Sequence, residues 1–356
     1  MDNEWRRILE ANRPIFERII SPDTDERIVQ LLFAAGKAQV HPILAQTNWD
    51  EVSTTTYLAI GPSIVLASRI ITSPLALLFW HAVLFEPQER VSCRKGEPRF
   101  VFRRAPAYHD FLPDEEVLRV HKILDELAMV ISFDFVLDIS TTGWCRPVPF
   151  PSRFRGTAGV GSDIELNSEQ LLDPLDVRTE KQHPLHVVLS YYTKLASVLV
   201  HEIAHAMSHA WHGSGKEMFF ENDICCELGF AFKNFVLGGQ LFTYRPPHPE
   251  AGHLRLRALP SAALTAIYQE NPNGAYLMPL RGEPGKSLKP HFGAERDPCW
   301  RVQDIWLERL FLQEFWENEI PRSGGRALRA RAQRTLCIDP FIRRRPSDVA
   351  REAKFH

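Results

Sequence analysis

Residues 185–211 read LHVVLSYYTKLASVLVHEIAHAMSHAW, an apolar run without glycine or proline, and this run decides the fold. Leu195, Val198 and Leu199 recur at helical spacing, and Gly213 follows as a C-cap, so the run predicts a long and mostly buried helix. Within it lies an H-E-x-x-H pentad, residues 201–205. Residues four apart on a helix share one face, so both imidazoles of the pentad can point at one ion.

The pentad predicts a zinc site. In such a site two neutral imidazoles hold Zn²⁺, a third ligand completes the protein set, and an open position keeps a water molecule. His201 and His205 are the expected metal ligands. Glu202 lies about 100° around the helix from His201, so it is expected to take a proton from the water as general base. Short pentads also arise by chance, but two histidines and a glutamate are unusual on a buried helix unless they bind a metal or one another.

The third ligand is not fixed by the helix itself. His209 continues the spacing of the pair, but on a straight helix its imidazole would lie about 12 Å along the axis from His201. We therefore expect His209 on the helix surface or beside the ligands. The metzincin pattern is disfavoured, because Ser208 and Trp211 occupy the positions where it needs glycine and histidine.

A carboxylate from the next helical segment is a better third ligand. Residues 219–239 read FFENDICCELGFAFKNFVLGG, with apolar residues at helical spacing. Glu227 lies on this segment, and Gly229 would allow it to approach the first helix closely. Glu221 and Asp223 are rivals at other spacings.

With these residues the chain resembles the zincin metallopeptidases, and among them the gluzincin type. In those families a glutamate on the helix after the H-E-x-x-H helix completes the site. The resemblance implies that His201, His205 and Glu227 hold zinc and that Glu202 is the general base. It covers a short motif and its order, and Cys226 stands where the best-known gluzincins have asparagine before the ligand.

The expected fold class is α+β and zincin-like, mainly helical, with a small mixed sheet and an active-site helix. Strands are predicted at residues 99–103, 133–139 and 161–167, a helix at 113–131, and a loop at 141–157, which is rich in proline, glycine and arginine. By analogy with zincins, residues 160–167 would form an edge strand that pairs with an extended peptide; an interior strand is the alternative.

Four regions are expected along the chain. Residues 1–90 form a helical N-terminal region, 91–240 the zincin-like core, 241–321 a loop-rich and helical part, and 322–356 a basic tail. The tail is expected to be solvated or to contact a partner. The apolar stretch 54–85 is divided by Pro62, Arg69 and Pro74, which favours core helices over a membrane span. Within 241–321, residues 261–268 are a short helix candidate, and 302–316 carry an amphipathic stripe typical of a core helix.

Composition narrows the class of protein. The chain has 356 residues, 44% of them apolar, which is enough for a sizeable core. A net charge of -2 makes a nucleic-acid partner unlikely on electrostatic grounds. The six cysteines show no C-x-x-C spacing, which suits a reducing compartment. The charged N-terminal stretch does not resemble a secretory signal, so we expect a cytoplasmic protein without a membrane segment.

The function expected from these features is zinc-dependent hydrolysis, most simply of a peptide or another amide. Two alternatives remain: a zincin-fold enzyme acting on a small-molecule metabolite, and a non-catalytic scaffold with a structural metal or none. A peptidase needs an open edge strand, whereas a metabolite enzyme would cap the metal with the loops at 141–157 or 244–249. A residue that stabilises the oxyanion is also needed, and the candidates are Tyr244, His248, His253, Tyr268, Tyr276 and His291.

Overall fold

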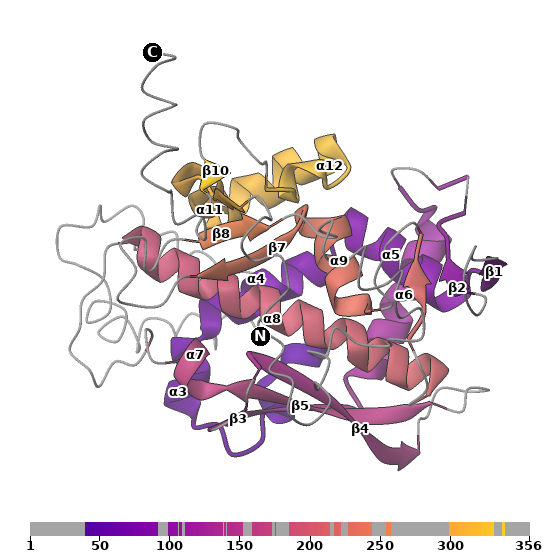
Figure 1. Cartoon of the computed structure of the whole chain (residues 1–356), viewed down its shortest axis with the longest axis horizontal. Helices are drawn as coiled ribbons and strands as arrows, with labels where there is room; N and C mark the ends of the chain where they lie inside the picture. The colour runs from indigo at the N-terminus through magenta and orange to yellow at the C-terminus, as the bar shows by residue number, and fades with distance from the viewer. Residues whose placement is uncertain are drawn as a thin grey trace, which may run out of the picture.

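The computed structural model describes residues 40–91, 99–105, 107–108, 111–137, 139, 141–151, 159–172, 175, 185–213, 217–221, 227–243, 254–257, 299–330 and 337–338. Over these ranges the chain is α+β: helices surround one long helix, and the strands form three small sheets (Figure 1). This confirms the expected class, mainly helical with a small mixed sheet.

The long helix α8, Leu185–His212, is the centre of the structure. It ends at Gly213, whose positive φ of 82° closes the last turn while its N–H donates to the His209 carbonyl oxygen at 3.0 Å. The C-terminal end of the helix agrees with the sequence prediction. Residues from all sides of α8 are buried, because α4, α9, α11 and the β3–β5–β4 sheet pack around it.

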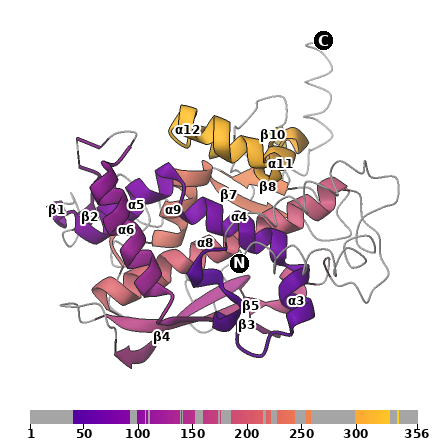
Figure 2. The same ribbon diagram turned by 180° about the vertical axis from the view of Figure 1, so that it is seen from behind.

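Three helices lie in the N-terminal part of the described chain, and the second of them packs along α8. They are α3 (Thr54–Ala59), α4 (Gly61–Ile71) and α5 (Pro74–Phe85), preceded by the short turns η2 (Pro42–Leu44) and η3 (Gln46–Asn48). Seen from behind, α4 runs along α8 (Figure 2). Nearly every residue of α4 and α5 is buried, as expected for core helices. Over the described residues no single helix is both long and apolar enough to cross a membrane, and α4 with α5 meets that test only as a pair bent by 62°.

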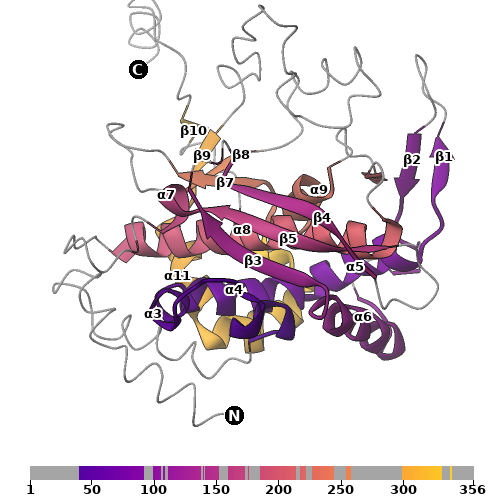
Figure 3. The same cartoon turned by 90° about the horizontal axis from the view of Figure 1, so that it is seen from below.

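A mixed sheet lies against the other side of α8 (Figure 3). Its order is β3–β5–β4, with β3 (Ile131–Val136) parallel to β5 (Val160–Asn167) and β4 (Gly143–Pro151) antiparallel to β5. Two expectations are therefore wrong. Residues 160–167 form the central strand and not an edge, and the expected loop at 141–157 contains the edge strand β4. Alternating prolines concealed this strand, because proline cannot donate to a ladder and usually signals a loop.

Among the described strands β4 has a neighbour on one side only, and the register defines which backbone groups face the other side. The N–H of Asn167 donates to the carbonyl oxygen of Thr142 at 3.0 Å, so the odd-numbered residues of β5 face β4. Their partners in the register are the even-numbered residues of β4, namely Trp144, Arg146 and Val148. The backbone groups of the odd-numbered residues consequently face away from β5, along the edge: Gly143, Cys145 and Pro147.

A second sheet joins segments that are distant in the sequence. It has the order β1–β2–β6, with β1 (Glu89–Val91) antiparallel to β2 (Arg99–Phe102) and β2 parallel to β6 (Phe219–Phe220). Helix α6, Asp114–Leu127, packs beside α5 and α8, and β3 follows four residues later at Ile131, so the predicted helix was too long at its end. The short helix α7, Ser168–Leu171, follows β5 directly, with Asn167 as its N-cap.

The segment after β6 contains a shorter helix than expected. The predicted helix over 219–239 is a strand at its beginning and α9, Leu228–Leu237, at its end. Gly238 ends α9 with a φ of 85°. The strand β7, Gln240–Thr243, then opens an antiparallel sheet of order β10–β9–β8–β7 with β8 (Leu254–Arg257), β9 (Cys299–Arg301) and β10 (Cys337–Ile338).

The C-terminal part adds α11 (Asp304–Phe311), a π-helical turn η6 (Phe315–Glu319), α12 (Ile320–Ser323) and η7 (Arg326–Leu328). The amphipathic stripe is confirmed except at Ile305, which is 63% exposed. The expected boundary of the tail at residue 322 is too early. Leu328 and Ala330 are buried, and the Ala330 N–H donates to the Leu237 carbonyl oxygen at 2.9 Å, so these residues still belong to the core. The expected helix at 261–268 lies outside the described residues.

Buried His41 predicts a pH dependence of stability. Its Nδ1 accepts from the Ile43 N–H at 3.3 Å, and Asp125 lies 3.7 Å from Nε2. Burial lowers the pKa of His41 to about 4, with His121 acting in the same direction and Asp125 against it. The unfolded chain, with a pKa near 6.5, therefore binds this proton first as the pH falls, and stability is lost below that value.

We expect the His41→Asn variant, which keeps an N-cap but cannot titrate, to show a weaker pH dependence than the wild type. Between pH 7 and pH 5 the wild-type free energy of unfolding should fall by about 1–2 kcal/mol more than that of the variant. Urea unfolding at both pH values measures this difference. An equal fall in the free energy of unfolding of both proteins would show that His41 does not titrate as proposed.

Candidate metal centre

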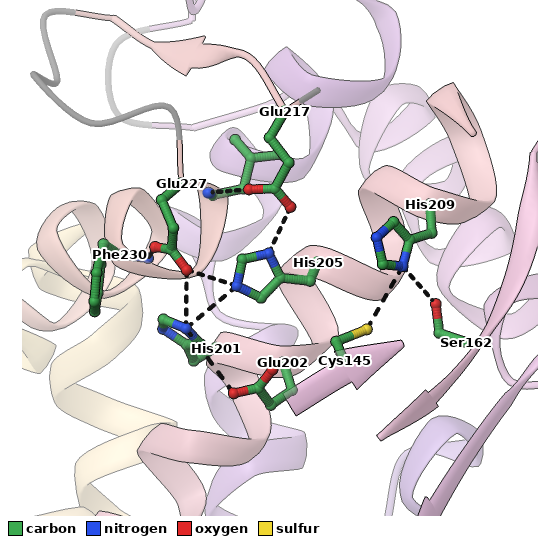
Figure 4. Close-up of polar contacts among 10 residues, drawn as sticks. Cys145, Ser162, His201, Glu202, His205, His209, Glu217, Glu227 and Phe230 are labelled. Atoms are coloured by element: carbon green, nitrogen blue, oxygen red, sulfur yellow. Dashed lines mark hydrogen bonds and ion pairs between the residues drawn. The ribbon is translucent and has the colours of Figure 1, made fainter. Parts of the chain in front are cut away.

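The two histidines of α8 point their Nε2 atoms to one place. His201 Nε2 and His205 Nε2 are 3.3 Å apart, and both side chains are 13% exposed (Figure 4). Two ligand atoms bound tetrahedrally at about 2.0–2.1 Å from one ion lie roughly 3.3 Å apart. The spacing of the imidazoles therefore fits a shared metal ion.

Glu227 brings a carboxylate oxygen to the same place. Its Oε1 lies 3.0 Å from His201 Nε2 and 2.6 Å from His205 Nε2. Its Oε2 accepts a hydrogen bond from the N–H of Phe230, because Glu227 is the N-cap of α9. Glu227 was expected within a helix; it stands at the helix start instead, and this cap directs the other oxygen at the histidines.

Gly229 allows this close approach, as the sequence suggested. A Cβ atom at Gly229 would lie 2.6 Å from atoms of the His201 ring, which no packing tolerates. Phe230 then places its ring 5.1 Å from the His201 ring, edge to face. The Phe230 ring and the contact of Nε2 with Glu227 position His201, whereas its Nδ1 is buried without a hydrogen-bond partner among the described residues.

Glu202 lies on the other side of His201 from Phe230 (Figure 4). It is 4% exposed, and its Oε1 lies 3.9 Å from His201 Nε2. The ligand atoms of His201, Glu202 and His205 lie within 4.8 Å of one another, so Glu202 could itself bind an ion. Glu227 is the better third ligand, because its oxygen is 3.0 Å or less from both imidazoles.

The edge strand β4 lies against the side chain of Glu202 at Gly143. A Cβ atom at Gly143 would lie 2.6 Å from Glu202 Oε1, so a larger residue would require the carboxyl group to shift. Burial raises the pKa of Glu202 to about 7, with His205 acting in the opposite direction. A carboxyl group in this range can both accept and donate a proton at neutral pH.

Glu217 is a site residue that the sequence analysis missed. Its Oε1 lies 2.5 Å from His205 Nδ1, and its Oε2 accepts the N–H of Leu228 at 2.8 Å (Figure 4). A carboxylate in this position fixes the ring of a metal-binding histidine and makes its Nε2 a better ligand. Glu217 belongs to neither helix, so no helical spacing could single it out.

The pKa shifts of the ligands follow from these contacts. Burial lowers the pKa of His201 to about 4. Burial acts in the same direction on His205, but Glu217 and Glu227 outweigh it and raise the pKa of His205 well above its usual value. For Glu227, burial would raise the pKa, and the two histidines instead hold it well below its usual value. The carboxylates thus favour positive charge between the imidazoles, which a bound cation would supply.

The other candidates lie elsewhere. Glu221 pairs with Arg104 at 2.5 Å, and Asp223 is outside the described residues. His209 is buried against the mixed sheet, where its Nδ1 lies 2.9 Å from Ser162 Oγ and 3.6 Å from Cys145 Sγ. The candidates for oxyanion stabilisation are outside the described residues: Tyr244, His248, His253, Tyr268, Tyr276 and His291.

Comparisons with protein-family models, with curated proteins and with solved structures find no match for this chain. The site is therefore interpreted from its own geometry: two imidazoles, a capping carboxylate, a supporting carboxylate and a buried glutamate beside an edge strand.

Glu227 can be tested as a ligand without loss of the helix cap. Serine is a good N-cap but too short to reach the histidines, so the Glu227→Ser variant keeps α9. We expect it to bind zinc at least about tenfold more weakly, because loss of a ligand exceeds the 10–100-fold effect typical of a supporting residue. Zinc titration against a chelator measures this, with Glu221→Gln as the matched control. Equal effects of both variants would remove Glu227 from the site.

Glu217 can be tested by the Glu217→Gln variant, which keeps the size of the side chain. An amide can still accept the Leu228 N–H but carries no charge toward His205. We expect zinc affinity to fall about 10–100-fold while circular dichroism stays unchanged. Unaltered zinc affinity would show that Glu217 has only a structural role.

Proposed function

We propose that this chain is a zinc-dependent hydrolase of the zincin type that cleaves amide bonds in extended peptides. The observation that carries the proposal is the position of Glu227 Oε1, within 3.0 Å of both His201 Nε2 and His205 Nε2. Two imidazoles and one carboxylate are a common ligand set of catalytic zinc, which keeps one position open for water. We further propose a cytoplasmic location, which the cysteine usage supports.

Glu202 would carry the proton transfers. A bound zinc ion lowers the pKa of a water molecule and polarises the carbonyl group of the substrate. Glu202 accepts the proton of the attacking water and then delivers it to the leaving amine. Burial raises the pKa of its carboxyl group to about 7, and Gly143 places no side chain against that group.

The edge of β4 supports a peptide substrate over a small metabolite. Gly143 and Cys145 turn their backbone groups away from β5, and Gly143 lies next to Glu202. An extended segment that pairs with this edge would therefore run past the proposed base. Pro147 has no N–H to offer, so pairing would be limited to the first part of the strand. Short extended peptides are accordingly the first substrates to test.

The Glu202→Gln variant separates chemistry from metal binding. Glutamine keeps the shape of the side chain but cannot accept a proton at neutral pH. We expect about one zinc per chain in both proteins, and a loss of roughly 10²–10⁴ in peptide turnover in the variant. Elemental analysis and a fluorogenic peptide library measure the two quantities.

The His201→Ala and His205→Ala variants provide the control, since both should lose zinc together with activity. Full turnover by a zinc-loaded Glu202→Gln protein would reject the mechanism. Undiminished zinc in both histidine variants would reject the metal centre.

A further inference from the structure

The site contains a buried ammonium group that metal binding and proton transfer do not use. Lys233 lies on α9 and is 7% exposed. Its Nζ is 5.5 Å from the centre of the Phe230 ring, and that ring is 5.1 Å from the His201 ring. Lys233 is therefore held near the metal ligands by the helix that also carries Glu227.

Lys233 is not a direct partner of either nearby carboxylate. Its charge acts on His201, Glu202 and Glu227, yet among the described residues it forms no ion pair within 4.0 Å. A lysine that served only to neutralise a buried carboxylate would be expected to bind it directly, because an unpaired buried charge is costly. Burial lowers the pKa of Lys233 to about 8, with Glu227 and Glu202 acting against that, so the side chain is still charged at neutral pH.

The ammonium group of Lys233 balances the negative charge of the site. Three carboxyl groups converge here, those of Glu202, Glu217 and Glu227. A divalent ion offsets two of them, and the ammonium group of Lys233 offsets the third. During hydrolysis the proton of the water moves to Glu202, and negative charge builds up on the former carbonyl oxygen of the substrate. A fixed cation in a dry site is well suited to stabilise that oxygen.

The position of Lys233 also fits this role. Phe230 and Glu202 lie on different sides of His201 (Figure 4), and Lys233 lies over the Phe230 ring. The ammonium group thus belongs to the α9 side of the site, whereas the proposed base comes from α8. An oxyanion needs its donor away from the base, so that the two groups contact different atoms of the substrate.

We infer, on the basis of the hydrolytic function proposed above, that Lys233 is the residue that binds the negatively charged oxygen of the tetrahedral species. This assigns to lysine the part for which tyrosine and histidine side chains were considered. The ligand chemistry is a tetrahedral oxyanion, for which inorganic phosphate is a simple probe.

The test is a pair of titrations on the zinc-loaded full-length chain. Phosphate carries the charge and shape of the tetrahedral species, whereas imidazole is a neutral ligand that enters the same site. We expect Lys233→Met to bind phosphate about 10–100-fold more weakly, since a charge-assisted hydrogen bond is lost, and to bind imidazole as the wild type does. Lys233→Arg should keep phosphate affinity within about threefold, because it retains the charge.

Lys194→Met is the matched control. Lys194 is also buried, at 9% exposure, but its Nζ donates to the Gln170 carbonyl oxygen at 3.2 Å. This variant should bind phosphate normally. Calorimetry gives the dissociation constants, and elemental analysis gives the zinc content of each protein.

The outcomes separate the two proposals. Full zinc content with unchanged phosphate affinity in Lys233→Met overturns the role of Lys233 and leaves the hydrolase standing. If Lys233→Met binds phosphate and imidazole more weakly by the same factor, the role of Lys233 is also overturned, since that result indicates a general disturbance of the site. Absence of zinc from the wild type overturns both.

Discussion

The close approach of α9 to α8 is the constraint on which the site depends. Glu227 caps α9 with one oxygen and faces both histidines with the other, so the helix start and the candidate metal centre share one side chain. Gly229 permits the approach by leaving space for the His201 ring, and Glu217 ties the two elements together by contacting His205 and the Leu228 N–H. A small shift of α9 would therefore change the distances from Glu227 to both histidines.

This arrangement also explains why so many ionisable groups tolerate burial. Glu217 and Glu227 each accept a backbone N–H and contact a histidine, whereas burial raises the pKa of Glu202 to about 7. Structural carboxylates are fully satisfied by their contacts. The carboxyl group whose pKa burial raises is thus the one proposed to exchange protons.

The sequence predicted the parts of the fold that depend on periodicity and caps. The helix at 185–211, its end at Gly213 and the strand at 161–167 follow from local spacing. The resemblance to gluzincins added Glu227 to His201 and His205 as candidate ligands, and the structure brings the three side chains together. Long-range pairing was not predictable in the same way. Nothing within 160–167 indicates which strands lie on either side of it, and Glu217 acquires its role only when the chain returns to His205. In β4 the local signal was misleading, because a strand with a free edge can accept prolines that a central strand cannot.

Pro147 has a further consequence for the molecule in solution. An exposed strand edge is a template on which a second chain can add its own strand, and repetition of that step leads to aggregates. Pro147 turns its missing N–H toward this edge, and Pro149 and Pro151 follow at alternate positions. The backbone groups of Gly143 and Cys145 remain available for pairing on this edge, whereas the prolines interrupt a continuous ladder. The same strand would then combine a short pairing site, as proposed for the substrate, with protection against edge-to-edge association.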